Sequence, residues 1–84
     1  MTLTTPTVHL NGTSREDLSD HYEAAYRAMN DAIDAVCGAS PNARDYYVQA
    51  DGAFTRAVSE QESRLQRLRD VRDELLALYE AVQG

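Results

Sequence analysis

The residues best suited to chemistry lie in PNARDYY, residues 41–47. Arg44 carries a planar guanidinium that can grip a phosphate or a carboxylate with two parallel hydrogen bonds. Tyr46 and Tyr47 can stack on a flat ring such as a nucleobase, and their hydroxyls can donate hydrogen bonds. Asp45 can orient Arg44 or accept a hydrogen bond from the edge of a base. This segment is therefore a candidate recognition loop.

The same segment also has a structural interpretation. Asp45 can help to cap a following helix, while one tyrosine closes the open end of a helix pair. Two adjacent tyrosines in an extended loop cannot both point inward, however, so this interpretation leaves either Tyr46 or Tyr47 without a structural role. Both interpretations stay open at this point.

A second polar cluster precedes the first helical pattern. His9, Asn11 and Thr13 lie just ahead of an expected helix N-terminus, whose free amides favour anions. A turn followed by a capped helix is the alternative explanation. We expect the two clusters at opposite ends of one helix pair. In an oligomer, the arm of one subunit can reach the tyrosine loop of its neighbour and complete a ligand-binding site.

Two arginines of the second helical pattern are candidates for the same site. We expect Arg69 and Arg72 near the end of the hairpin that carries the arm, where they add positive charge. The alternative is ordinary ion pairing with Glu16, Asp17 or Asp73.

Other chemistry has little support in the sequence. Asp17 and His21 have the spacing of a helical ligand pair, but the further ligands of a metal site in a helical bundle are missing. Cys37 is the single cysteine, which excludes an internal disulfide, and no activating base lies beside it. The sequence contains no glycine-rich phosphate loop and no catalytic triad. We therefore expect neither an enzyme nor a cofactor or metal.

Two long helical patterns must position these residues. Residues 14–37 and 52–82 both repeat apolar residues with alternating spacings of four and three, which is typical of helices that pack along one seam. Residues 1–13 and 38–51 contain the prolines and predict an extended arm and a loop. The whole chain of 84 residues is expected to form a single domain.

The apolar stripes predict which residues form the seam. Thr13 and Glu16 match a capping box at the start of the first helix. Gln61 and Arg72 interrupt the second stripe with polar groups. The stripe of the first helix consists of Leu18, Tyr22, Ala25, Met29, Ala32 and Val36, and that of the second consists of Phe54, Val58, Gln61, Leu65, Leu68, Arg72, Leu75, Tyr79 and Val82.

These patterns predict an all-α fold, an antiparallel two-helix hairpin with an extended N-terminal arm. The second helix is longer, and we expect its extra length at the C-terminal end, partly covered by the arm. The expected overhang carries Leu75, Leu78, Tyr79 and Val82, and the covering residues are Leu3, Val8 and Leu10. Because two helices bury only one seam each, we expect a homo-oligomeric helical bundle, most simply a dimer. A monomeric hairpin is the alternative.

Charge and hydropathy narrow the classes of partner. The formal net charge of −6 disfavours general binding to nucleic acid or to an anionic membrane. No apolar run approaches the length of a membrane span, and the first residues do not resemble a signal peptide. We therefore expect a soluble, cytoplasmic protein.

The segments HLNGTSRE, residues 9–16, and PNARDYY resemble a group of small uncharacterised proteins encoded by phages and prophages of GC-rich bacteria. The resemblance covers most of the chain and implies a phage origin without an activity. In size, acidity and hairpin form, the chain is also similar to phage anti-defence proteins that act as sponges for cyclic nucleotides.

The resulting expectation is a phage-encoded, non-enzymatic protein in the host cytoplasm. It sequesters a small anionic signal, a cyclic nucleotide of bacterial anti-phage immunity, at pockets between subunits. The alternative is an acidic helical protein that binds a host or phage protein to inhibit or scaffold it.

Overall fold

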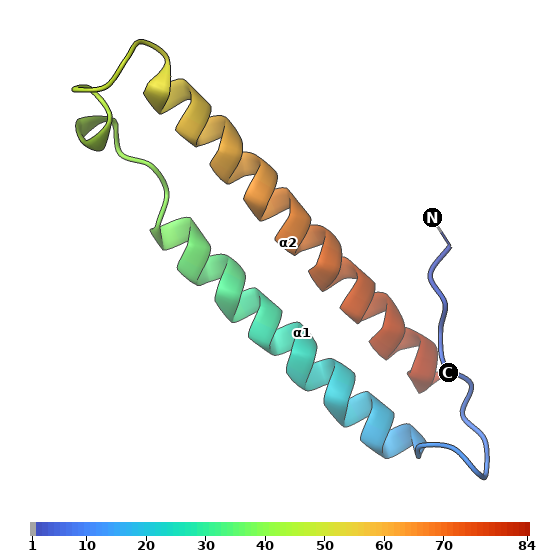
Figure 1. Ribbon diagram of the computed structural model, residues 1–84. Coiled ribbons are helices and arrows are strands. Elements are labelled where there is room, and N and C mark those ends of the chain that lie inside the picture. The colour runs from blue at the N-terminus through green and yellow to red at the C-terminus, as the bar shows by residue number, and fades with distance from the viewer. Residues whose placement is uncertain (1) are drawn as a thin grey trace.

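The computed structural model describes residues 2–84 and consists of two antiparallel helices joined by a long loop (Figure 1). Helix α1 spans Arg15–Gly38 and helix α2 spans Ala53–Gln83. A 3-10 turn, η1, lies between them at Ala43–Asp45. Within the described residues there is no strand. The predicted all-α hairpin is confirmed, and each helix begins and ends one residue later than the sequence predicted.

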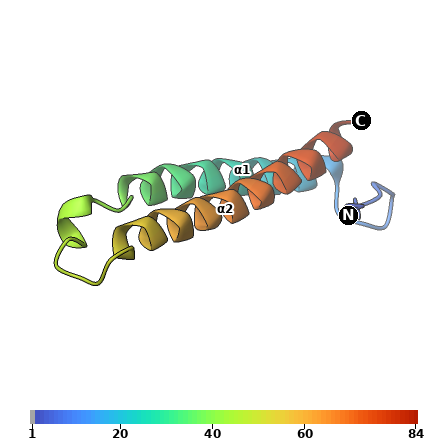
Figure 2. The ribbon, with the colours of Figure 1, turned by 90° about the horizontal axis from the view of Figure 1, so that it is seen from above.

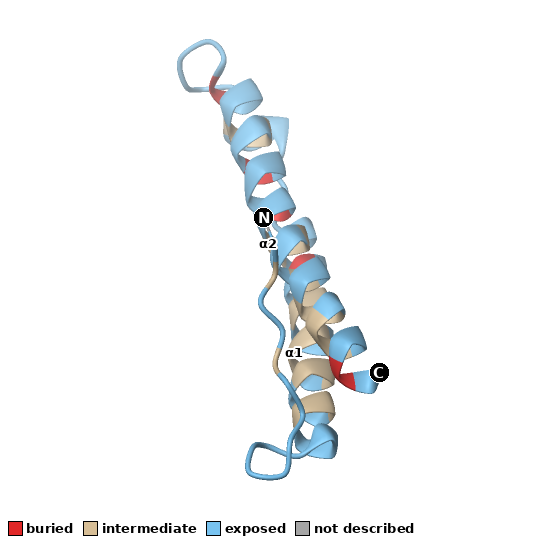
Figure 3. Ribbon diagram, turned by 90° about the vertical axis from the view of Figure 1, so that its right-hand side faces the viewer, coloured by how far each residue is buried: buried red, intermediate tan, exposed pale blue. Residues whose placement is uncertain are grey.

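The hairpin is a rod with a thin core. Its principal extents are 62 × 24 × 16 Å, and the helices lie side by side along their length (Figure 2). The radius of gyration is 18.3 Å, whereas a compact domain of this length has about 12 Å. Few of the described residues are buried, and they follow the seam (Figure 3). These are Ile33, Ala53, Gln61, Leu65 and Val82.

The core stripe of α1 departs from the predicted heptad. Leu18, Tyr22 and Met29 are half-buried as expected, but Ala32 is exposed and Ile33 is the buried residue of that turn. A straight α-helix drifts by about 20° per heptad relative to a strict seven-residue repeat. Two heptads after Leu18 this drift amounts to about 40°, less than the about 100° between neighbouring residues, so the seam passes between Ala32 and Ile33. Ile33 is the residue buried there, and the predicted core position of Ala32 is wrong.

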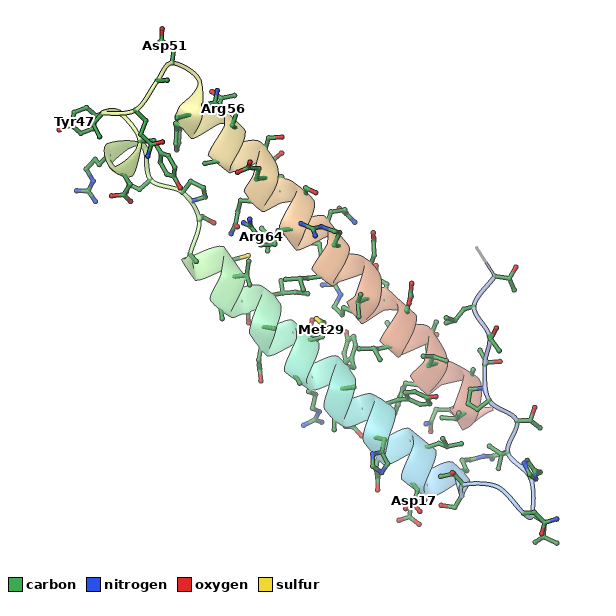
Figure 4. All side chains as sticks on the ribbon, in the orientation of Figure 1. Asp17, Met29, Tyr47, Asp51, Arg56 and Arg64 are labelled. Carbon is green, nitrogen blue, oxygen red and sulfur yellow. The ribbon has the colours of Figure 1, made fainter. Side chains whose placement is uncertain are left out.

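A buried glutamine ties the two helices together near the loop. Gln61 is 5% exposed, and its Nε2 donates a hydrogen bond of 2.7 Å to the carbonyl oxygen of Val36 in the last turn of α1. Its Oε1 accepts a hydrogen bond of 2.6 Å from Nη1 of Arg64, which lies between the helices in Figure 4. Both ends of the buried amide are therefore satisfied, as a polar group in a core requires.

A second glutamine joins the helices at the open end. Nε2 of Gln83 donates a hydrogen bond of 2.7 Å to the hydroxyl of Ser19. This contact places the end of α2 opposite the second turn of α1. At the loop end, α1 stops soon after Val36, whereas α2 extends about eight residues beyond Gln61, roughly 12 Å. The overhang of α2 is thus at the loop end, and the prediction that it lies at the C-terminal end is wrong.

The N-terminal arm covers less of the hairpin than predicted. It runs beside the last turns of α2 (Figures 1 and 3), and Leu3 and Pro6 are half-buried there. Val8 is 36% exposed and Leu10 is 97% exposed, so these two residues are not covering residues. Val82, at 2% exposed, is the most buried residue of this end.

The N-terminal cap of α1 is Ser14 rather than Thr13. Its side chain accepts a hydrogen bond of 3.1 Å from the backbone N–H of Asp17. Thr13 is exposed and lies outside the helix. The predicted capping box of Thr13 and Glu16 is therefore wrong, although Glu16 and Asp17 do occupy the first turn, where the helix dipole favours negative charge.

The bond between Gln61 and Val36 yields a stability prediction. Gln61→Met keeps the side-chain length but removes the hydrogen bond, and we expect the free energy of unfolding to fall by about 1 kcal/mol. The loss stays moderate because the Val36 carbonyl also accepts from the N–H of Ala39. Urea denaturation followed by circular dichroism measures the change. The matched control is Gln66→Met on the exposed surface of α2, which should change stability by less than about 0.5 kcal/mol; equal losses in both variants would contradict this account.

Candidate functional site

The loop between the helices is long because it follows the overhang of α2. Its first half is held by Asn42, whose Oδ1 accepts a hydrogen bond of 2.9 Å from the N–H of Arg44 and starts the η1 turn. Its second half ends at Gly52, which has a φ of 85° and precedes α2 without a side-chain cap. Asp45 therefore does not cap α2, and that part of the structural interpretation is wrong.

The two adjacent tyrosines have separate roles. Tyr46 is half-buried, and its ring packs on Phe54 of α2 with 6.1 Å between the ring centroids. Tyr47 is 79% exposed and points away from both helices (Figure 4). One tyrosine thus covers the start of α2, and the other is exposed to solvent.

Arg44 is oriented by an asparagine and not by its neighbouring aspartate. Its Nε donates to Oδ1 of Asn42 at 3.3 Å. The ion pairs found among residues 2–84 are Arg27–Glu23 and Arg72–Asp73, so Asp45 does not hold Arg44. Asn42 was not among the predicted site residues, although an asparagine directly before a turn is a recognisable signal of an Asx turn.

An aliphatic residue extends the exposed surface. Val48 follows Tyr47 and is 76% exposed. We call the surface formed by Arg44, Tyr47 and Val48 the tip. A hollow of about 170 Å³ lies beside it, lined by Tyr46, Tyr47, Gln49, Ala50, Asp51, Gly52, Ala53 and Phe54. Val48 was also missed, although an apolar residue directly after two tyrosines in a loop is itself unusual.

The arm cluster lies at the other end of the rod. His9, Asn11 and Thr13 are exposed, and the backbone N–H of Gly12 donates to the carbonyl of His9 at 3.1 Å. The turn interpretation of this segment is thereby confirmed. A single chain does not bring the arm cluster to the tip, because the rod is 62 Å long.

Arg69 and Arg72 lie in the middle of the hairpin. Both are half-buried. Along α2, Arg69 lies roughly 12 Å beyond Gln61, and Arg72 lies roughly 16 Å before Gln83. Nε of Arg72 donates to Asp73 at 3.0 Å, so the ion-pair interpretation of Arg72 is confirmed. Their predicted position near the arm is wrong, because the two helices are paired in a different register.

The described part of the chain has no group of three acidic, histidine or cysteine side chains that could hold a metal ion. Within the same residues, neither helix combines the length and the apolar character needed to cross a membrane. Comparison with protein-family models, curated proteins and solved structures finds no match. The tip is therefore the candidate functional site.

The two tyrosines should respond differently to truncation. Tyr46→Ala removes the contact with Phe54 and should lower the free energy of unfolding by about 1 to 2 kcal/mol. Tyr47→Ala removes an exposed ring and should change stability by less than about 0.5 kcal/mol. Urea denaturation of the two variants measures the difference. A Tyr47→Ala protein as destabilised as Tyr46→Ala would show that both rings belong to the fold.

Proposed function

We propose that the protein is a non-enzymatic interaction protein that binds a host or phage protein through the tip. One observation carries the proposal: the neighbouring residues Tyr47 and Val48 are 79% and 76% exposed, and they belong to the loop at one end of a rod. Burying these two side chains in a partner's pocket removes apolar surface from water, which is the main driving force of protein association. The homo-oligomeric bundle expected from the sequence belongs to the same proposal.

The composition of the tip suits a protein partner. Tyrosine and arginine are enriched among the residues that dominate binding energies at protein interfaces. The hollow beside the tip has about 170 Å³, whereas pockets for small molecules usually have about 300 Å³ or more. The tip therefore resembles a knob that enters a partner more than a pocket that encloses a ligand.

The loop also holds the tip in place before binding. Asn42 organises the turn below Arg44, and Tyr46 anchors the loop on Phe54. A preorganised loop loses less conformational freedom on association than a flexible one, which favours affinity. The formal charge of −6 suits a partner with a basic rim around its pocket.

Affinity capture from host and phage lysates tests this function. Because the side chains of Tyr47 and Val48 point to solvent, Tyr47→Ala combined with Val48→Ser should leave the fold intact and reduce the captured partner at least tenfold. Gln49→Ala, at the next exposed loop position, is the matched control and should capture as much as the parent protein. Equal capture by the double variant and the parent would exclude the tip as the binding surface.

A second candidate function is sequestration of a small anionic ligand, such as a cyclic nucleotide of anti-phage immunity. The observation that favours it is Arg44: its Nε contacts Asn42, while no hydrogen bond or ion pair of its two terminal nitrogens occurs within residues 2–84. These nitrogens can grip a phosphate while the ring of Tyr47 stacks on a base. The arm cluster of another subunit would then close the site.

Thermal denaturation with a panel of cyclic di- and trinucleotides tests the second candidate. A ligand at one hundred times its dissociation constant stabilises the folded state by about 2.7 kcal/mol, which raises the melting temperature of a domain of this size by about 10 °C or more. Arg44→Ala should abolish this rise, whereas Arg67→Ala on the exposed surface of α2 should not. A melting temperature that stays constant across the panel would rule out these ligands.

A further inference from the structure

A groove crosses both helices in the open half of the hairpin, far from the tip. It has a volume of about 220 Å³ and is lined by Glu23, Tyr26 and Arg27 of α1 and by Leu76 and Tyr79 of α2. A shallower depression of about 310 Å³ adjoins it and is lined by Asp20, Glu23, Ala24 and Arg27. Together these surfaces, which we call the groove face, present two aromatic rings and a leucine inside a charged rim.

The chain exposes more surface than a folded monomer of its mass should. Its accessible surface is 6275 Å², whereas a globular protein of 9.4 kDa has about 5,000 Å². The excess of roughly 1,300 Å² is larger than the ~800 Å² that each partner buries in an interface of standard size. A second rod lying against the first would therefore bring the exposed surface closer to the ordinary range.

The charged rim of the groove face is complementary to itself. Arg27 pairs with Glu23 at 2.7 Å, but its side chain is still 75% exposed. Asp20 and Arg27 lie at equal distances on either side of the Glu23–Ala24 midpoint. A two-fold axis through that midpoint, perpendicular to α1, places Arg27 of each copy opposite Asp20 of the other. Ala24, at the centre, is small enough to let two helices approach closely.

We propose that the groove face binds a second copy of the chain in an antiparallel dimer. The two α1 helices lie side by side at the centre, and the two-fold axis passes between Glu23 and Ala24. Tyr26, Leu76 and Tyr79 of each copy become buried, and Arg27 forms ion pairs with Asp20 of the partner copy. This inference names the surface through which the homo-oligomer of the proposed function forms. Because that surface is separate from the tip, its test does not depend on binding at the tip.

The position of the groove face determines the shape of the dimer. The midpoint of the rim lies about 13 Å along α1 from its first residue, so only the open halves overlap. Two rods of 62 Å then form an assembly roughly 90 Å long, with one tip at each far end. The dimer is bivalent and can hold two partners at once, whereas full overlap of the rods would keep the length near 62 Å.

Charge exchange on the rim tests the dimer. Arg27→Glu places like charges opposite each other and should weaken dimerisation at least tenfold in sedimentation velocity experiments at low salt. Adding Asp20→Arg restores the pair between copies and should bring the dissociation constant back to within about threefold of the parent value. Asp20 and Arg27 are seven residues apart on one helix, so they do not form a helical neighbour pair within one chain. Arg67→Glu on the exposed surface of α2 is the matched control and should leave dimerisation unchanged.

Small-angle X-ray scattering on the parent protein gives a second readout that needs no substitution. A maximum dimension near 90 Å supports the partly overlapping dimer, and one near 62 Å contradicts it. A parent protein that stays monomeric at 200 µM would overturn the proposal, as would an Arg27→Glu protein that dimerises like the parent. Circular dichroism of each variant verifies that the helix content is unchanged, so that a loss of dimer is not a loss of fold.

Discussion

The hydrogen bond from Gln61 to the carbonyl of Val36 is the constraint on which the rest of the hairpin depends. Apolar side chains along a two-helix seam tolerate several registers, because contacts between them have no fixed direction. A buried amide does not tolerate a change of register, since leaving its donor without an acceptor costs about 1 to 3 kcal/mol. The end of α1 supplies that acceptor: the Val36 carbonyl accepts from the N–H of Ala39 and from Nε2 of Gln61. The amide therefore selects the register in which the end of α1 lies beside Gln61.

This register explains the length and composition of the loop. It leaves the first turns of α2 without a partner helix, and the chain has to cover them on its way back from α1. Tyr46 does so by packing on Phe54, and Asn42 turns the backbone so that the next residues point outward. The exposure of Tyr47 is then a consequence of the covering loop. The tip and the groove face lie in opposite halves of the rod, so partner binding and self-association can occur together.

The sequence was sufficient for the helices and insufficient for their pairing. Periodicity predicted both helices to within one residue, because each has a long amphipathic repeat between clear stop signals. It failed at Ala32 and Ile33, which lie on either side of the seam once the helical repeat has drifted from the strict heptad, and of which only the isoleucine is buried. It also failed to predict the register of the two helices. From the sequence, Gln61 was a polar interruption of the apolar stripe, whereas in the structure its side chain forms a hydrogen bond between the helices. In the candidate site, the loop and the exposure of one of its two tyrosines were predictable, whereas the exposure of Val48 and the orienting role of Asn42 depend on how the loop folds over α2.

Nuclear Overhauser contacts of the Gln61 side-chain amide test the register most directly. The observed pairing predicts contacts from the two Nε2 protons to protons of Val36 and Cys37 at the end of α1. If the overhang of α2 lay at its C-terminal end, Gln61 would instead face Ala28 and Met29, about two turns earlier in α1. Contacts to Val36 would support the bond that positions the loop and the tip. Contacts to Ala28 or Met29 would contradict it and remove the physical reason for the exposed tip.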